Sequence, residues 1–209
     1  MRVLIAGASS ALGIATAEAL TAAGHEVIAV GSDAGRLAAV PATREVCDLA
    51  DFAAVQELAG RVGPIDGLLH LVGGWRGGGG LAGQTDEDWD WLETRILTTL
   101  RNTTRAFLPT LDRLPAARVA IVSTTGLAKP TAGNANYLAA KGAAEAWLGA
   151  VGHALAPTGG RVAIERVMAL VSSGNREAHP DKDFSRFTDV TELAQRFVAL
   201  WDGPASTSE

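Results

Sequence analysis

The chain has 209 residues, 47% of them hydrophobic, so it can bury a substantial core and fits one domain more comfortably than two. Its net charge of −5 is spread without long blocks of like charge, which disfavours nucleic acid and anionic membranes as partners. A single cysteine, Cys47, excludes a disulfide scaffold and a multi-cysteine zinc site. No apolar run is long enough for a signal peptide or a membrane span, so we expect a soluble, cytoplasmic protein.

Short aliphatic segments alternate with longer amphipathic ones, which predicts a parallel sheet covered by helices. The predicted strands are 2–7, 26–31, 45–47, 65–72, 118–123 and 161–167. The predicted helices are 12–23, 34–40, 51–62, 86–112, 137–156 and 189–201. We therefore expect one doubly wound α/β domain of the Rossmann type over residues 1–201, with about six strands, and a C-terminal tail at 202–209.

Three of the helices have recognisable starts. Thr85 precedes three acidic residues, 86–88, which would meet the positive end of the helix dipole. Asp51 and Asp189 are expected to begin their helices in the same way.

The first predicted strand runs directly into GASSALG, residues 7–13, and then into an alanine-rich helix. Such a turn leaves backbone N–H groups at a helix N-terminus, where the helix dipole favours an anion such as a dinucleotide pyrophosphate. Gly7 would allow the tight turn, and Gly13 the close packing of helix on sheet. The spacing is not G-x-G-x-x-G, and position 11 is alanine, so the turn alone also fits a connection without a ligand.

The only tyrosine, Tyr137, is followed four residues later by Lys141, one of three lysines. Residues i and i+4 share a face of an α-helix, so the two side chains can address one ligand together. The alternative interpretation is that the pair has no ligand: the tyrosine is half-buried, and the lysine beside it extends its ammonium to solvent.

These widely separated features resemble the short-chain dehydrogenase/reductase family, whose signatures are T-G-x-x-x-G-x-G after the first strand and Y-x-x-x-K on a later helix. Further family landmarks are matched by CDLAD (47–51), TRAFLP (104–109) and IVSTTG (121–126). The strand end IDGLLHLVGG (65–74) matches only at Gly73. The resemblance spans residues 1–201 and implies an NAD(P)-dependent oxidoreductase acting on a small-molecule carbonyl/alcohol pair.

The resemblance also implies roles for individual residues. Tyr137 would be the general acid/base, and Lys141 would lower its pKa and bind the nicotinamide ribose. A family hydroxyl that holds the substrate oxygen falls on Thr124, thirteen residues before the tyrosine, with Ser123 as its substitute. The "STT" segment could equally only end the strand. Besides Tyr137 and Lys141, the implied cofactor-binding residues are Gly7, Ser9, Ser10, Leu12, Gly13, Ser32, Asp48, Leu49, Gly73 and Ser172.

The choice of cofactor depends on the end of the second strand. Gly31 stands where NAD-binding members carry an acid, and Ser32 and Arg36 would tolerate the extra phosphate of NADP(H). Asp33 favours NAD(H) instead. We expect NADP(H), by a small margin.

Several positions depart from the family pattern. Ile96 replaces the asparagine that supports a proton-relay water, Ala11 replaces a glycine near the phosphates, and Val167 and Met168 replace Pro-Gly. These departures keep two alternatives open: a catalytically impaired nucleotide- or partner-binding homologue, and a dehydratase, isomerase or cyclase that uses the same site. The family's usual pairing through helices 86–112 and 137–156 implies a homodimer or homotetramer.

Two other features have competing interpretations. The glycine-rich segment 73–80 predicts a loop beyond the fourth strand, where Trp75 could fold over a substrate or belong to a flexible connection. The four histidines show no metal-ligand spacing, and His70 is expected to be a hydrogen-bonded structural residue.

Overall fold

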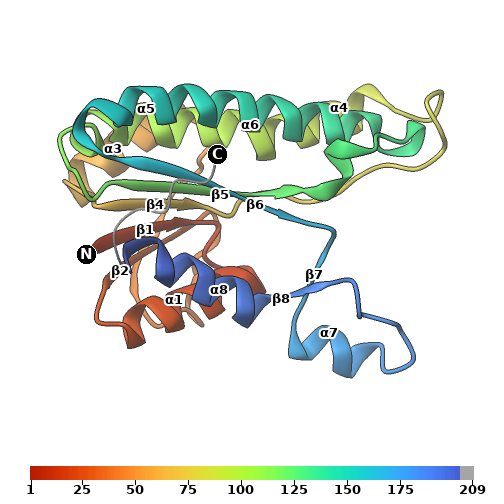
Figure 1. The fold of residues 1–209 in the computed structure, drawn as a ribbon, viewed down its shortest axis with the longest axis horizontal. Coiled ribbons are helices and arrows are strands. Elements are labelled where there is room, and N and C mark those ends of the chain that lie inside the picture. The colour runs from red at the N-terminus through yellow and green to blue at the C-terminus, as the bar shows by residue number, and fades with distance from the viewer. Residues whose placement is uncertain (203–209) are drawn as a thin grey trace.

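A computed structural model describes residues 1–202, and its centre is a six-stranded sheet in the order β3-β2-β1-β4-β5-β6 (Figure 1). The strands are β1 (Arg2–Ala6), β2 (Glu26–Gly31), β3 (Thr43–Val46), β4 (Gly67–His70), β5 (Arg118–Thr124) and β6 (Arg161–Val167). Every neighbouring pair is parallel. Each strand overlaps a predicted one, so the Rossmann-type sheet is confirmed.

Helices cover both faces of this sheet (Figure 1). One face carries α3 (Phe52–Val62), α4 (Asp86–Glu93), α5 (Thr99–Leu111) and α6 (Ala135–Leu155). On the other face α1 (Ala11–Ala22) packs against α8 (Val190–Val198), and the short α2 (Ala34–Leu37) contributes Leu37 to the same cluster. Single 3₁₀ turns occur at Thr125–Ala128, Ala132–Asn134, Ala156–Thr158 and Ala199–Trp201.

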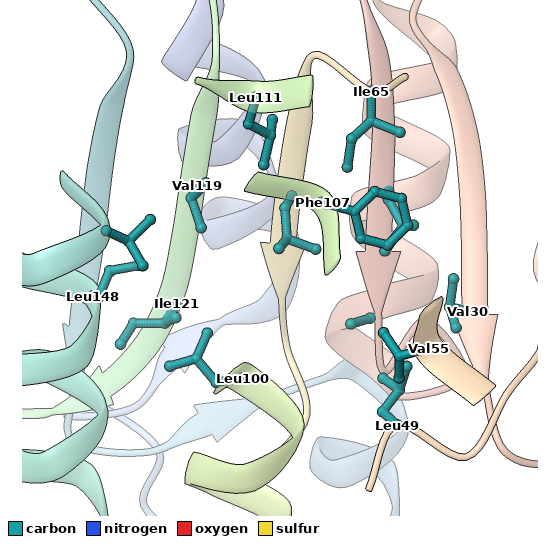
Figure 2. Close-up of a cluster of buried hydrophobic side chains, with 14 of the residues drawn as sticks. Val30, Leu49, Val55, Ile65, Leu100, Phe107, Leu111, Val119, Ile121 and Leu148 are labelled. Carbon is teal, nitrogen blue, oxygen red and sulfur yellow. The ribbon is translucent and has the colours of Figure 1, made fainter. Parts of the chain in front are cut away.

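The central strands are buried on both faces, as a doubly covered parallel sheet requires. In β1, Leu4 belongs to the cluster under α3, α5 and α6, whereas Ile5 belongs to the cluster under α1 and α8. Figure 2 shows the first cluster, where Leu100, Phe107 and Leu111 of α5 lie against the sheet. These residues hold the α5 side of the molecule to the strands whose carboxyl ends form the site.

The structure differs from the predicted elements in two places. The expected helix 86–112 is divided into α4 and α5 by a π-helical turn, Thr94–Thr98, which buries Ile96. Between β6 and α8 the chain adds β7 (Leu170–Val171), α7 (Ser173–Ala178) and β8 (Thr188–Asp189), and β7 pairs with β8 outside the main sheet. Two-residue strands and a six-residue helix are too short for a periodic pattern to reveal them.

The predicted helix starts are confirmed. The side chains of Thr85, Asp51 and Asp189 each accept a hydrogen bond from a backbone N–H in the first turn of α4, α3 and α8, respectively. No helix within residues 1–202 has both the length and the apolar character needed to cross a membrane.

His70 ends β4 and is 3% exposed, with its Nε2 3.0 Å from Thr99 Oγ1. Burial, together with the charge of Lys141, lowers the pKa of its imidazole to about 3. The expectation of a hydrogen-bonded structural histidine is confirmed. The side chain is therefore neutral in the folded protein at every pH near neutrality.

This burial makes stability depend on pH. The unfolded chain binds a proton at His70 below its ordinary pKa of 6.5, while the folded chain binds one only near 3, so stability falls as pH falls through this window. Between pH 7.5 and 5 we expect the His70 contribution to cost about 2 kcal/mol of unfolding free energy. Urea unfolding of wild type and His70→Gln at both values measures it, since the glutamine amide reaches the position of Nε2 without titrating. Equal pH dependence in the two proteins would contradict the assignment.

Candidate active site

The turn between β1 and α1 requires both of its glycines. Gly7 has φ +82°, and a Cβ there would lie 2.9 Å from the backbone nitrogen of Val72. A Cβ on Gly13 would lie 2.4 Å from the carbonyl oxygen of Ala8. Ser10 caps α1 by accepting a hydrogen bond of 3.0 Å from the Gly13 N–H. The tight turn and the close helix contact expected of these residues are both present, and the N-terminus of α1 opens toward the carboxyl ends of the strands.

A cavity of about 370 Å³ lies beside this turn. Seven of the predicted cofactor-binding residues line it: Gly7, Ser9, Ser10, Ser32, Asp48, Leu49 and Gly73. Arg36 and Arg95 line the same cavity. Asp33 does not line it; its carboxylate accepts a hydrogen bond of 2.8 Å from the Arg36 N–H and caps α2.

A larger cavity of about 870 Å³ adjoins the first and shares Ser10, Leu71, Val72 and Gly73 with it. It lies where the strand order reverses between β1 and β4, the usual ligand position in open α/β sheets. The predicted site residues that line it are Ser10, Leu12, Gly73, Ser123, Thr124, Tyr137 and Lys141. The structure thus brings the glycine turn and the Tyr137–Lys141 pair to one continuous space.

Two predicted cofactor-binding residues line neither cavity. Gly13 packs beneath the turn instead. The Ser172 hydroxyl caps α7 in a reciprocal arrangement with Asn175, donating to its Oδ1 at 2.9 Å. Asn175 itself lines the larger cavity.

Tyr137 lies in the first turn of α6 and lines the larger cavity together with Thr124, the last residue of β5, whose Oγ1 accepts a hydrogen bond of 3.1 Å from the Gly126 N–H. Lys141, one turn further along α6, is 7% exposed. Its ammonium donates a hydrogen bond of 2.7 Å to the Val122 carbonyl and lies 5.9 Å from the centre of the Tyr137 ring. These contacts hold the phenol, the hydroxyl and the ammonium against the end of one strand.

The protonation of the pair follows from its burial. Burial raises the pKa of Tyr137, and the hydrogen bond with Thr124 opposes that rise. Burial also lowers the pKa of Lys141 to about 8, against the attraction of Glu145. The pKa of Tyr137 is therefore raised overall, because the effect of burial outweighs that of Thr124. This differs from the lowering by Lys141 that the sequence predicted. The ammonium donates its hydrogen bond to the Val122 carbonyl instead. At neutral pH the phenol keeps its proton and the lysine keeps its charge.

Glu145 extends the same face of α6 by another turn. It forms a two-point ion pair with Arg166 of β6, at 3.0 Å and 2.6 Å. Burial raises the pKa of Glu145, but its hydrogen bonds with Arg166 and the positive charges of Arg166 and Lys141 outweigh this and lower the pKa overall. The Ser123 Oγ has no hydrogen-bond partner within residues 1–202.

The position of the family's relay asparagine offers no polar side chain. Ile96 is 2% exposed and belongs to the core cluster under α5 and α6. Asn102, further along the helix, donates to the carbonyls of Leu49 and Ala50 instead, at 3.0 Å and 2.9 Å. It supports the rim of the smaller cavity and is not part of a relay to Lys141.

Sequence reasoning missed several residues that line the cavities. In the larger cavity these are Lys129, Asn134, Asn175 and Arg186, and in the smaller one Arg95. All come from segments without a motif, and only their places beyond strand ends could have pointed to them. No group of three or more His, Cys, Asp or Glu side chains in the described part of the chain is placed to hold a metal ion.

Comparison with known proteins places this geometry in a family. The family model described as short chain dehydrogenase matches residues 1–178. A Streptomyces virginiae protein named for ketoacyl reduction in a monensin polyketide synthase is 34% identical over 172 residues, which is 75% of this chain and 65% of that protein. The chain spans 57% to 65% of the length of the curated relatives it matches.

Solved structures agree with this match. A short-chain oxidoreductase of Thermus thermophilus is 29% identical with a TM-score of 0.78, and the match covers 100% of both chains. An NADPH-bound short-chain oxidoreductase of Pseudomonas aeruginosa, described as having an atypical catalytic centre, is 25% identical with a TM-score of 0.82 over 96% of this chain and 89% of the other. The chain with the Tyr137–Lys141 pair and the β1–α1 glycine turn therefore belongs to the short-chain dehydrogenase/reductase family.

Proposed function

We propose that the protein is an NADP(H)-dependent oxidoreductase that transfers a hydride between the nicotinamide and a small carbonyl/alcohol substrate. The proposal rests chiefly on Tyr137, Thr124 and Lys141 lining one cavity that continues into the glycine turn at the start of α1. The ketoacyl reductase name of one relative and the NADPH bound to another support it.

The residues present fit such a cofactor. A Cβ at Gly7 or Gly13 would collide with the backbone, so the turn stays narrow, and the α1 N-terminus beside Ser9, Ser10 and Leu12 suits a pyrophosphate. Asp48 and Leu49 would contact the adenine, and Lys141 the nicotinamide ribose. When bound, the nicotinamide supplies or accepts the hydride.

The chain's own residues would handle the proton. In reduction, Tyr137 donates its proton to the carbonyl oxygen, and the raised pKa of the phenol keeps that proton available at neutral pH. The Thr124 hydroxyl holds the same oxygen, and the buried charge of Lys141 stabilises the phenolate that remains. This protonation state suits the reductive direction.

The proposed preference for NADP(H) is supported by the residues that line the smaller cavity. Ser32 and Arg36 line it and could receive a ribose phosphate, and Arg95 adds a second cation. Asp33 is the residue that favours NAD(H), and its carboxylate accepts a hydrogen bond from the Arg36 N–H at the start of α2.

A catalytically impaired nucleotide-binding homologue is the second candidate, favoured by the buried Ile96 at the relay position. Non-redox use of the site, homodimer or homotetramer formation, and the cytoplasmic location stay predictions.

Replacing the tyrosine tests the proton transfer. We expect Tyr137→Phe to bind NADPH as wild type does, measured by cofactor fluorescence, because the phenol oxygen is not needed for the phosphate contacts. The kcat for any carbonyl compound reduced in a panel should fall by about 10²- to 10⁴-fold, the usual worth of a positioned acid. Thr124→Val serves as the companion variant that removes only the orienting hydroxyl. Unchanged turnover in Tyr137→Phe contradicts the assigned role, and failure of wild type to bind either nicotinamide cofactor contradicts the function.

The pH profile tests the lysine. Because Lys141 has a pKa of about 8, it loses its charge above that pH, and kcat for reduction should decline as pH rises through 8. Glu145 raises this pKa, so Glu145→Gln should move the declining limb to lower pH. Glu192→Gln, which removes an exposed acid paired with Arg196 on α8, is the control. If kcat declines at the same pH in Glu145→Gln as in wild type, Lys141 is not the group whose titration causes the decline.

Cofactor titration tests the assignment of the smaller cavity. We expect NADPH to bind more tightly than NADH, and Arg36→Ala to weaken NADPH while leaving NADH nearly unchanged, since only NADPH carries the ribose phosphate. Arg113→Ala, a change at an arginine outside both cavities, is the control. Tighter binding of NADH by wild type would reverse the preference.

A further inference from the structure

The segment 73–84, here called the glycine loop, is held by close backbone contacts. The Gly78 N–H donates a hydrogen bond of 2.7 Å to the Gly133 carbonyl. A Cβ on Gly77 would lie 2.6 Å from the same oxygen, and one on Gly83 would lie 2.7 Å from the Gly79 Cα. The glycines therefore permit backbone to pack directly on backbone, in contrast to the flexible connection that a glycine run suggests.

Gln84 joins the glycine loop to the turn before α6. Its Nε2 donates to the carbonyls of Gly78, Gly80 and Gly133, at 2.9, 3.2 and 3.3 Å. Its Oε1 accepts a hydrogen bond of 3.0 Å from the Asn136 N–H. Donors and acceptor each meet the complementary partner, so both ends of the amide are satisfied and its orientation is determined.

A second set of contacts holds the other end of the loop. A Cβ on Gly74 would lie 2.4 Å from the Trp91 ring, so the backbone lies directly on that side chain. The Arg76 guanidinium stacks over Trp91 at 4.4 Å and pairs with Asp88 of α4 at 3.1 Å. The loop is thus attached to α4 as well as to the turn before α6.

Trp75 is the side chain that this arrangement presents to the larger cavity. It is 60% exposed, and its Nε1 donates a hydrogen bond of 3.0 Å to Asn134 Oδ1, three residues before Tyr137. Leu138 and Met168 line the same cavity. An exposed indole held at one edge offers its face to a planar apolar group.

We propose that Trp75 is a specificity-determining residue that selects a planar apolar group next to the reacting carbonyl, and that Gln84 is the residue that positions it. This rests on the proposed reductase function. Gln84 acts by holding the loop that carries Trp75 against the turn before α6, so the Trp75 wall of the site is in place before substrate arrives. The entropy lost in ordering the loop is then lost when the protein folds and not when substrate binds.

Hydrogen–deuterium exchange tests the positioning without any turnover. In wild type, the Gly78 amide, which donates to the Gly133 carbonyl, should exchange more slowly than the other amides of 75–82. In Gln84→Ala the Gly78 amide should exchange on the order of tenfold faster, while β5 peptides stay unchanged. Gln84→Glu keeps the acceptor for Asn136 but loses the donors to the three carbonyls, so it should loosen the loop equally. Gln56→Ala, a change at an exposed position of α3, is the control. Fast exchange of the Gly78 amide in wild type, or no change at this amide in both Gln84 variants, overturns the proposal.

Kinetics with two ketones of equal carbon number test the specificity. With NADPH, we expect wild type to have a lower KM for acetophenone, which is planar, than for cyclohexyl methyl ketone. Gln84→Ala and Trp75→Ala should each raise the KM for acetophenone about tenfold with kcat nearly unchanged. The double variant should be no worse than Trp75→Ala, because Gln84 acts through Trp75.

The outcomes separate this proposal from the function on which it rests. Failure of wild type to bind NADPH contradicts the reductase assignment. The exchange data then still test whether Gln84 positions the loop that carries Trp75. Bound NADPH with no preference for acetophenone overturns the substrate class. Additive effects of the two substitutions overturn the action of Gln84 through Trp75.

Discussion

The buried hydrogen bond between the Lys141 ammonium and the Val122 carbonyl organises the site. A charged group that is 7% exposed needs a polar partner, and the end of β5 supplies one at 2.7 Å. This contact ties α6 to the end of β5 beside Tyr137 and Thr124, and a Cβ built on Gly73 would lie 3.8 Å from the ammonium. The same burial brings the lysine pKa to about 8, close to the physiological range. The burial of Lys141 thus accounts both for its hydrogen bond with the end of β5 and for its lowered pKa.

Two charged residues near the carboxyl end of β6 form ion pairs with both helical layers. Glu165 pairs with Arg196 of α8, and Arg166 pairs with Glu145 of α6 on the opposite face of the sheet. They tie both helical layers to one edge strand. Glu145 in turn raises the pKa of Lys141, so these ion pairs link the edge strand to the electrostatics of the lysine. The buried Ile96 offers no polar side chain at the relay position.

Much of the fold and part of the site followed from local physics. The helix starts at Thr85 and Asp51 and the contact of Gly13 with Ala8 involve neighbours in sequence, and strand burial follows from short apolar runs, so patterns revealed them. Gly7 was found from the glycine pattern of the turn, although the backbone that it contacts, at Val72, is distant in sequence. The π-helical turn, the β7–β8 pair and the cavity residues Lys129 and Arg186 depend on packing between distant segments. Gln84 illustrates the limit: its partners lie up to 52 positions away, and nothing in its surroundings distinguishes it from a surface glutamine.

The backbone packing of Gly77 on Gly133 has a consequence for how this site can evolve. Gly74, Gly77 and Gly83 have no room for a side chain, because a Cβ there would lie within 2.7 Å of the Trp91 ring, the Gly133 carbonyl oxygen and the Gly79 Cα, respectively. Arg76 pairs with α4, and Trp75 is the side chain of this segment that lines the larger cavity. Under the proposed function, new substrate preferences would then arise by substitution of Trp75 alone, with the backbone of the loop unchanged. Such a substitution would leave the position of Tyr137 undisturbed.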